Sequence, residues 1–219
     1  MSKPQKIFTT CLWGVLLLAM AGVVAGKLFW ARNPDGSRGL AGGGPEVLFP
    51  AAEFRLTDQD AKPFGNAELK GRPYVAAFVF TTCGSICPRM TTQMAALQKD
   101  LPAEVQLVSF SVDPKHDTPE VLKRYAATYK ADESRWHFLT GEREAVVKVV
   151  GEMKLPFKDE QAGDHPILHS ERLLLIDGDN RIRGTYLSHE PDALKKLVAD
   201  AKYLAGHPGD KAGETGARS

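Results

Sequence analysis

The sequence predicts an α/β domain in which a central, mostly parallel β-sheet is flanked by helices on both faces. Strand-like and helix-like segments alternate along the middle of the chain, which is typical of parallel strands joined by helices. Residues 74–80 (YVAAFVF) form an unbroken apolar run, as expected of a strand that is buried on both faces. The last two strand-like segments are close in sequence and add an antiparallel hairpin at the edge.

The first half of this domain contributes two strands and a helix. Residues 54–57 predict a short strand, and residues 74–80 predict the buried one. A helix begins at Pro88, because proline is tolerated at the first helical position, and it ends at Pro102. The apolar residues of this helix fall on one face, where core packing is the default for the methionines: Met90, Met94, Leu97 and Leu101.

The second half of the domain shows the same alternation of strand-like and helix-like segments. Residues 105–112 predict a strand, and the segment Asp117-Thr118-Pro119-Glu120 predicts a helix start with a cap, a proline and an acid in the first turn. Asp113 and Asp117 are expected to shape this loop and cap the helix, with a supporting role near a metal as the alternative. The other elements are a strand at 136–139, a helix capped by Thr140, strands at 173–176 and 181–186, and a helix from Pro191.

Composition excludes several classes of protein. The chain has 219 residues and a net charge of +1, which suits one domain with attachments and gives no basic stripe for nucleic acid. Its three cysteines are too few for a disulfide scaffold, and Cys11 lies in the first apolar segment. The remaining pair, Cys83 and Cys87, closes too short a loop to stabilise a fold much, so it indicates metal-binding or redox chemistry.

Residues 7–30 form a long apolar segment that we expect to be one N-terminal transmembrane helix. About 20 apolar residues span a bilayer, and Lys3 and Lys6 favour a cytoplasmic location for residues 1–6. A cleaved signal peptide is the main alternative, with a passable cleavage site at Val23-Val24-Ala25. A buried core helix is disfavoured because the segment has no polar face. Both leading interpretations place the rest of the chain outside the cytosol, on the periplasmic side.

Glycine-rich segments border the predicted domain. Residues 31–45 contain almost no bulky side chain and predict a flexible linker. Residues 206–219 again lack core-forming side chains, and we expect a disordered tail. The folded domain is therefore expected over residues 46–205.

Cys83 and Cys87 lie between the buried strand and the helix that follows it. A helix N-terminus presents free N–H groups and a positive dipole, which favour thiolate over thiol. Three residues separate the cysteines, so both sulfur atoms can point the same way, whereas a thioredoxin-type redox motif has two intervening residues. With cysteines at the carboxyl end of the first central strand, the sequence predicts a thioredoxin-like α/β sandwich.

His169 is the strongest candidate for a third ligand. It lies just before the strand at 173–176, and in a thioredoxin-like sheet that loop packs beside the cysteine loop. Two thiolates and one imidazole make a soft, three-coordinate site, which suits Cu(I), while structural Zn(II) prefers four ligands. The main alternatives are a plain redox pair at the cysteines and a partly buried structural histidine at position 169. His165 is expected to be a solvated loop residue rather than an accessory ligand.

Four segments together resemble the Sco/SenC family. They are FTTCGSICP at 80–88, SVDPKHDTPEVLKRY at 111–125, WHFLTG at 136–141 and HS at 169–170, and they occur in the family's order. The match covers the predicted domain from about Phe54 to Leu204, and the apolar segment at 7–30 matches the family's anchor.

This resemblance implies a membrane-anchored protein that binds Cu(I) and Cu(II) through Cys83, Cys87 and His169. Such proteins help to build the dinuclear copper site of cytochrome c oxidase, as copper donors, as thiol–disulfide reductases of that site's cysteines, or both. The implied partners are the copper-bearing oxidase subunit, other periplasmic copper chaperones and thiol reductants. A peroxiredoxin-like peroxidase is a third hypothesis, which rests on the fold alone.

Two residues depart from the pattern that many relatives carry. Gly84 stands where many have proline after the first cysteine, which loosens the loop. Leu168 stands where many have aspartate before the histidine, which removes a carboxylate beside the third ligand. We therefore expect the affinity for Cu(II) to differ from that of relatives.

Overall fold

The structure is a computed structural model that describes residue 20 and residues 44–153 and 171–210. A compact unit begins at Gly44. Its described strands are β1 Phe49–Pro50, β2 Arg55–Asp58, β3 Pro63–Gly65, β4 Tyr74–Val79, β5 Gln106–Ser111, β6 Trp136–Thr140, β7 Arg172–Ile176 and β8 Arg181–Leu187. Its described helices are α2 Asn66–Leu69, α3 Ile86–Asp100, α4 Pro119–Thr128, α5 Arg143–Glu152 and α6 Pro191–Gly206.

The strands form one mixed sheet in the order β1-β8-β7-β4-β5-β6-β2-β3. The central strands β4, β5 and β6 are parallel to their neighbours in that group, and the other pairings are antiparallel. The prediction of a mostly parallel sheet is therefore wrong outside the three central strands. The predicted antiparallel hairpin of β7 and β8 is confirmed. The helix before β7 suggested a parallel crossover, but β7 runs antiparallel to β4.

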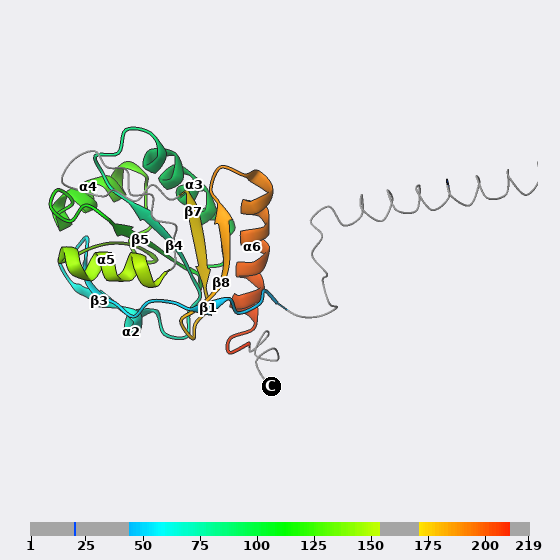
Figure 1. Ribbon diagram of the computed structural model, residues 1–219. Coiled ribbons are helices and arrows are strands. Elements are labelled where there is room, and N and C mark those ends of the chain that lie inside the picture. The colour runs from blue at the N-terminus through cyan, green and yellow to red at the C-terminus, as the bar shows by residue number, and fades with distance from the viewer. Residues whose placement is uncertain (1–19, 21–43, 154–170, 211–219) are drawn as a thin grey trace, which may run out of the picture. The chain divides into compact units, whose positions relative to one another are not determined.

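Helices cover both faces of the sheet, as predicted (Figure 1). All six residues of β4 are buried, and alternate side chains enter different cores. Val75, Ala77 and Val79 pack with residues of α3, α4 and α6, including Met90 and Met94. The intervening β4 residues pack with α5 on the opposite face. The two methionines are thus core residues, as expected.

Two predicted helix starts need correction. The first long helix begins at Ile86 rather than Pro88, so Cys87 lies inside its first turn. Proline is accommodated there because the first helical N–H groups have no intrahelical acceptor. Thr140 does not cap α5: it is the last residue of β6, where it pairs with Thr57, and Glu142 is the residue that precedes α5. Thr118 caps α4 and is followed by Pro119, in agreement with the predicted start.

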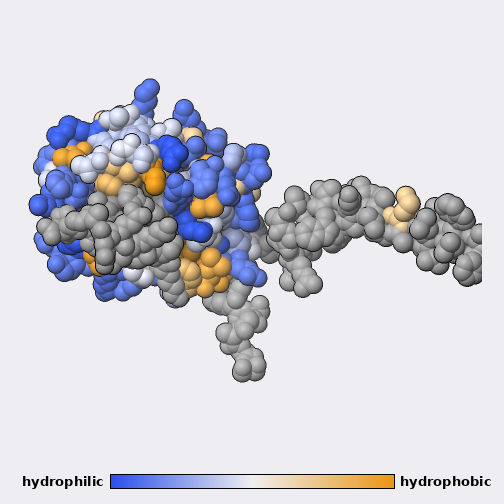
Figure 2. Space-filling view, turned by 45° about the horizontal axis from the view of Figure 1, so that its top comes forward, coloured by the Kyte–Doolittle hydropathy of each residue, from blue (hydrophilic) through white to orange (hydrophobic). Residues whose placement is uncertain are grey.

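The predicted membrane helix at 7–30 lies outside the described residues, apart from Met20. No described helix is both long and apolar enough to cross a membrane. On the face shown in Figure 2, the described apolar side chains form small separate patches among charged ones. Leu48 and Val147 are exposed large apolar residues of the described domain. Scattered residues of this kind are normal on a folded surface and do not indicate a binding site.

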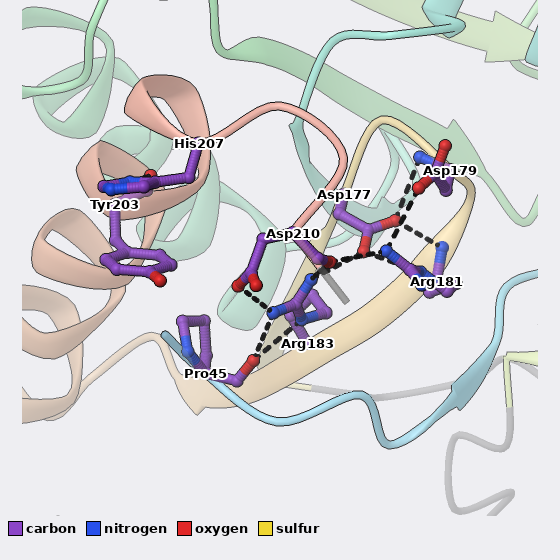
Figure 3. Close-up of polar contacts among 8 residues, drawn as sticks. All are labelled: Pro45, Asp177, Asp179, Arg181, Arg183, Tyr203, His207 and Asp210. Atoms are coloured by element: carbon purple, nitrogen blue, oxygen red, sulfur yellow. Dashed lines mark hydrogen bonds and ion pairs between the residues drawn. The ribbon is translucent and has the colours of Figure 1, made fainter. Parts of the chain in front are cut away.

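A buried ion cluster holds both ends of the described domain against β8 (Figure 3). The Arg183 guanidinium has no exposed surface and donates to Asp177 Oδ2 at 2.8 Å and Asp210 Oδ2 at 3.0 Å. Its Nε also donates to the Pro45 carbonyl oxygen at 2.8 Å. Asp177 has a second partner in Arg181, at 2.9 Å from Nε. One arginine therefore joins Pro45, the last residue of the predicted linker, to Asp210, which follows α6 and lies in the predicted tail.

Replacing Arg183 with methionine tests this cluster. The variant removes the bonds that Arg183 donates to Asp210, Asp177 and the Pro45 carbonyl, while Asp177 keeps Arg181. We expect the free energy of unfolding to fall by about 3 kcal/mol, the lower end of the range for breaking a buried pair. Denaturant unfolding followed by circular dichroism measures this change. The control is Lys195→Met, which removes an exposed pair with Asp192 and should change stability little. Equal stability of the two variants would contradict the prediction.

Candidate metal centre

The buried strand β4 delivers the cysteine loop to the edge of the sheet. The chain leaves β4 at Val79, and the N–H of Cys83 donates to the Phe80 carbonyl oxygen at 3.2 Å, which closes a tight turn. Ser85 then precedes α3, and Cys87 occupies the second position of that helix. The first cysteine is therefore a loop residue and the second is a helix residue. This is the strand-to-helix junction that the sequence predicted.

The two sulfur atoms converge on the same helix start. The backbone N–H of Cys87 donates to the Sγ atom of Cys83 at 3.3 Å. Both cysteines are free thiols, and both are buried, with exposed fractions of 8% for Cys83 and 3% for Cys87. One sulfur thus lies over the free amides of the first helical turn and the other is packed beneath it. This arrangement brings Cys83 and Cys87 together, as expected.

The surroundings shift the pKa values of the two thiols in opposite directions. Burial by itself raises the pKa of Cys83, but hydrogen bonds from the amides of Ser85, Cys87 and Ile86 and from the Cys87 thiol outweigh it. The net pKa of Cys83 is therefore below that of an ordinary thiol. Deeper burial raises the pKa of Cys87 to about 12, and the neighbouring Cys83 and Asp117 add to that rise. Cys83 is consequently the sulfur that ionises first.

A buried carboxylate supports the start of the cysteine loop. Asp117 has no exposed surface and accepts from the backbone N–H of Thr81, at 3.1 Å to Oδ2, and from the Thr81 hydroxyl. The hydroxyl of Ser111, the last residue of β5, donates to the same carboxylate. Sequence reasoning assigned Asp117 to loop shaping and helix capping and missed its bond to Thr81. An aspartate between a central strand and the start of the next helix was the available signal, but the sequence did not identify its partner.

His169, the predicted third ligand, lies outside the described residues, as do His165 and Leu168. The chain is described again from Glu171, whose side chain accepts from His189 Nδ1 at 2.8 Å and pairs with Arg89 of α3 at 3.5 Å. Among the described residues, no three His, Cys, Asp or Glu side chains form a group that could hold a metal ion. The described part of the site is therefore the sulfur pair alone.

Other predicted candidates take structural roles. Asp113 Oδ2 accepts from His116 Nδ1 at 2.7 Å. His137 stacks on Phe64, with ring centroids 4.2 Å apart. Burial lowers the pKa of His137, so its ring stays neutral at a lower pH than the ring of a free histidine does. Neither histidine joins the cysteines.

The chemistry of this donor set is that of soft ligands. Two neighbouring sulfur atoms, one of which ionises readily, fit a thiophilic ion such as Cu(I) better than a hard cation such as Mg²⁺. The same two sulfur atoms can also exchange with a disulfide, since they are reduced and adjacent. The described geometry thus permits both of the chemistries that the sequence analysis left open.

Comparison with known proteins resolves the family. The SCO1/SenC family model matches residues 48–204. The SCO1 protein homolog of Bacillus subtilis is 33% identical over 186 residues, which covers 83% of this chain and 94% of that protein. A Stutzerimonas stutzeri protein, provisionally named as copper-binding, is 38% identical over 138 residues, or 60% of this chain and 66% of that protein.

Solved structures share the fold. The structure of BsSco is described as that of a member of the Sco family of cytochrome c oxidase assembly proteins, in which a disulfide switch was identified. It is 31% identical to this chain with a TM-score of 0.65, and the match covers 75% of this chain and 98% of BsSco. The thioredoxin-like α/β fold is therefore confirmed for the domain, with a mixed sheet. By sequence and by architecture, the chain belongs to the SCO1/SenC family.

Proposed function

We propose that this chain is a copper chaperone that binds Cu(I) and Cu(II) through Cys83, Cys87 and His169 and helps to assemble the dinuclear copper site of cytochrome c oxidase. The observation that supports this most is the pair of free sulfur atoms at the start of α3, where the Cys87 N–H lies 3.3 Å from Cys83 Sγ. The copper-binding name of one relative and the description of BsSco as an oxidase assembly protein support the same role.

Cys83, Cys87 and His169 contribute differently to copper binding, with copper as the cargo of the protein. Cys83 supplies a thiolate that is already favoured by the amides of the helix start. Cys87 must lose its proton when the metal binds, because burial keeps it a thiol otherwise. Copper uptake therefore releases protons, and affinity rises with pH until the buried thiol is no longer protonated. In this proposal His169 supplies the imidazole nitrogen that a Cu(II) ion prefers.

A thiol–disulfide reductase is the second candidate, and the unequal sulfur atoms favour it. In that reaction the Cys83 thiolate attacks one sulfur of a partner's disulfide, forms a mixed disulfide and releases the partner's first thiolate. Cys87 then gives up its proton and attacks Cys83, so the partner's second thiol leaves and a Cys83–Cys87 disulfide forms. Two electrons pass to the partner. The disulfide switch described for BsSco supports such a redox cycle.

The proposal includes a location and partners. We place the chain in the inner membrane, held by a single span at residues 7–30, with residues 1–6 in the cytoplasm. The linker at 31–45, the domain at 46–205 and the tail at 206–219 then lie on the periplasmic side. The recipient is the copper-bearing subunit of cytochrome c oxidase, and periplasmic copper chaperones and thiol reductants serve the cysteine pair.

Replacing His169 with alanine separates the two candidate functions. Cu(I) can remain on two thiolates, whereas Cu(II) prefers nitrogen or oxygen donors in a tetragonal geometry and is reduced by sulfur alone. We expect Cu(II) affinity to fall about 10-fold or more, with Cu(I) affinity and disulfide exchange changed much less. Metal titration by absorption spectroscopy and a dithiol exchange assay measure these effects, and oxidase assembly in cells gives the functional outcome.

The matched control is His165→Ala, since we expect His165 to be a solvated residue of the same loop. It should leave copper binding and oxidase assembly intact. If His169→Ala abolishes oxidase assembly while dithiol exchange persists, copper handling is the function. Normal assembly in that strain would refute the chaperone proposal and favour the reductase.

Differential alkylation tests the inequality of the two sulfur atoms. The lowered pKa of Cys83 means that it reacts with iodoacetamide at a pH below that needed for an ordinary thiol. The raised pKa of Cys87, about 12, means that it stays unreactive throughout the neutral range. Fragment-ion mass spectrometry of the reduced, metal-free protein assigns each label to its cysteine. Faster labelling of Cys87 than of Cys83 would reverse the proposed order of attack.

A further inference from the structure

Asp117 is a buried acid that adds to the raised pKa of Cys87, but the proposed copper and thiol chemistry gives its hydrogen bonds no part. Its side chain is completely buried, and the donors to it are neutral groups of Thr81 and Ser111. Among the described residues, no lysine, arginine or histidine forms an ion pair with it. Burial of a carboxylate without a cation is costly unless hydrogen bonds compensate for the lost water. The position therefore calls for a reason beyond packing.

Helix capping does not supply that reason. The residue that caps α4 is Thr118, whose hydroxyl accepts from the Val121 N–H at 3.4 Å. The backbone N–H of Asp117 donates to the Asp113 carbonyl oxygen at 3.0 Å, so the turn before α4 closes through the backbone. The Asp117 carboxylate is left to bind other elements, and those are the end of β5 and the segment that follows β4.

The bonds to Thr81 bear directly on the cysteine loop. Thr81 lies two residues before Cys83, and both its backbone N–H and its hydroxyl donate to the one carboxylate. Two donors from the same residue restrain its rotation as well as its position. Gly84, the residue after Cys83, lies in open space, because a Cβ atom there would meet no atom within 4 Å. On the side of the loop before Cys83, the bonds of Thr81 to Asp117 join the chain to a different element.

We propose that Asp117 is a positioning residue that clamps Thr81 to the end of β5 and thereby sets the separation between the Cys83 and Cys87 sulfur atoms. This inference rests on the proposed function in so far as copper is the ligand of those sulfur atoms. The clamp matters equally for a disulfide between them, since disulfide geometry tolerates only a narrow range of sulfur positions. Loosening the clamp should therefore change both the copper affinity and the dithiol–disulfide equilibrium of this cysteine pair.

The test compares Thr81→Val with Thr81→Ser in the full chain. Thr81→Val keeps the shape and the backbone N–H but removes the hydroxyl donor, whereas Thr81→Ser keeps both donors. Asp117→Asn is the third variant, because its amide NH₂ group opposes one of the existing donors. Ser109→Ala is the matched control, since it removes a buried hydroxyl of the same strand, which accepts from Trp136 Nε1 at 3.0 Å and not from the loop or Asp117. Denaturant unfolding of each variant measures the purely structural cost.

Two readouts report on the sulfur atoms. We expect Thr81→Val and Asp117→Asn to lower Cu(II) affinity about 10-fold and to shift the sulfur-to-copper absorption bands. We also expect the equilibrium constant between the metal-free dithiol and its disulfide in a glutathione buffer to change about tenfold, which is about 30 mV for two electrons. Thr81→Ser should keep wild-type values, and Ser109→Ala should lose stability without moving either readout.

The stability, spectra and dithiol equilibrium of the variants together decide whether Asp117 positions the cysteine loop. If Thr81→Val and Asp117→Asn lose stability but keep wild-type spectra and dithiol equilibrium, Asp117 is only a structural residue and the proposal is wrong. If Ser109→Ala moves both readouts as far as Thr81→Val does, the readouts follow a general loss of stability rather than the clamp, and the proposal is also wrong. If the wild-type protein binds no copper, the proposed function fails, and the dithiol equilibrium still decides the role of Asp117. If Asp117→Asn does not fold, the Thr81 pair decides.

Discussion

Burial of β4 on both faces is the constraint on which the rest of this structure depends. An entirely apolar strand must be covered by two layers, and α3, α4 and α6 cover one face while α5 covers the other. A strand in this position is also flanked on both edges, by β5 and β7. The chain can leave such a strand only at its ends. The loop at the carboxyl end therefore starts from a rigid point, and that loop carries Cys83.

The same constraint places the sulfur atoms in unequal surroundings. The loop must turn at once into α3, whose free amides lie against Cys83, while Cys87 follows the helix into the core. The hydrogen bonds to one thiol thus outweigh its burial, whereas for the other thiol burial outweighs its backbone hydrogen bond with Phe80. The two pKa values differ because Cys83 lies in the loop and Cys87 lies in the first turn of the helix. It gives a site that can offer a thiolate to an incoming ion or disulfide while it protects the second sulfur.

The features that depend on local chemistry could be predicted from the sequence, and those that depend on long-range pairing could not. The run at 74–80, the proline at 119 and the apolar periodicity around Met90 and Met94 are local, and the structure agrees with each of them. The direction of β7 is not local: a preceding helix is compatible with either direction, and the antiparallel pairing with β4 depends on how residues far apart meet.

Thr140 was assigned to a cap because its sequence suits one, but its pairing with Thr57 keeps it in β6. The cysteine pair was predicted from spacing and position, whereas the Asp117–Thr81 bond joins residues 36 apart in the chain and carries no local signature. His169 as a ligand stays a prediction.

X-ray absorption at the copper edge tests the central claim most directly. The reduced protein is loaded with one equivalent of Cu(I) per chain and freed of loosely bound metal with a chelator. The proposed site predicts that copper is retained with two sulfur neighbours and one nitrogen neighbour, and that the sulfur shell disappears when Cys83 and Cys87 are both replaced with serine. Loss of the metal to the chelator, or a shell of nitrogen and oxygen alone in the unsubstituted protein, would contradict the account.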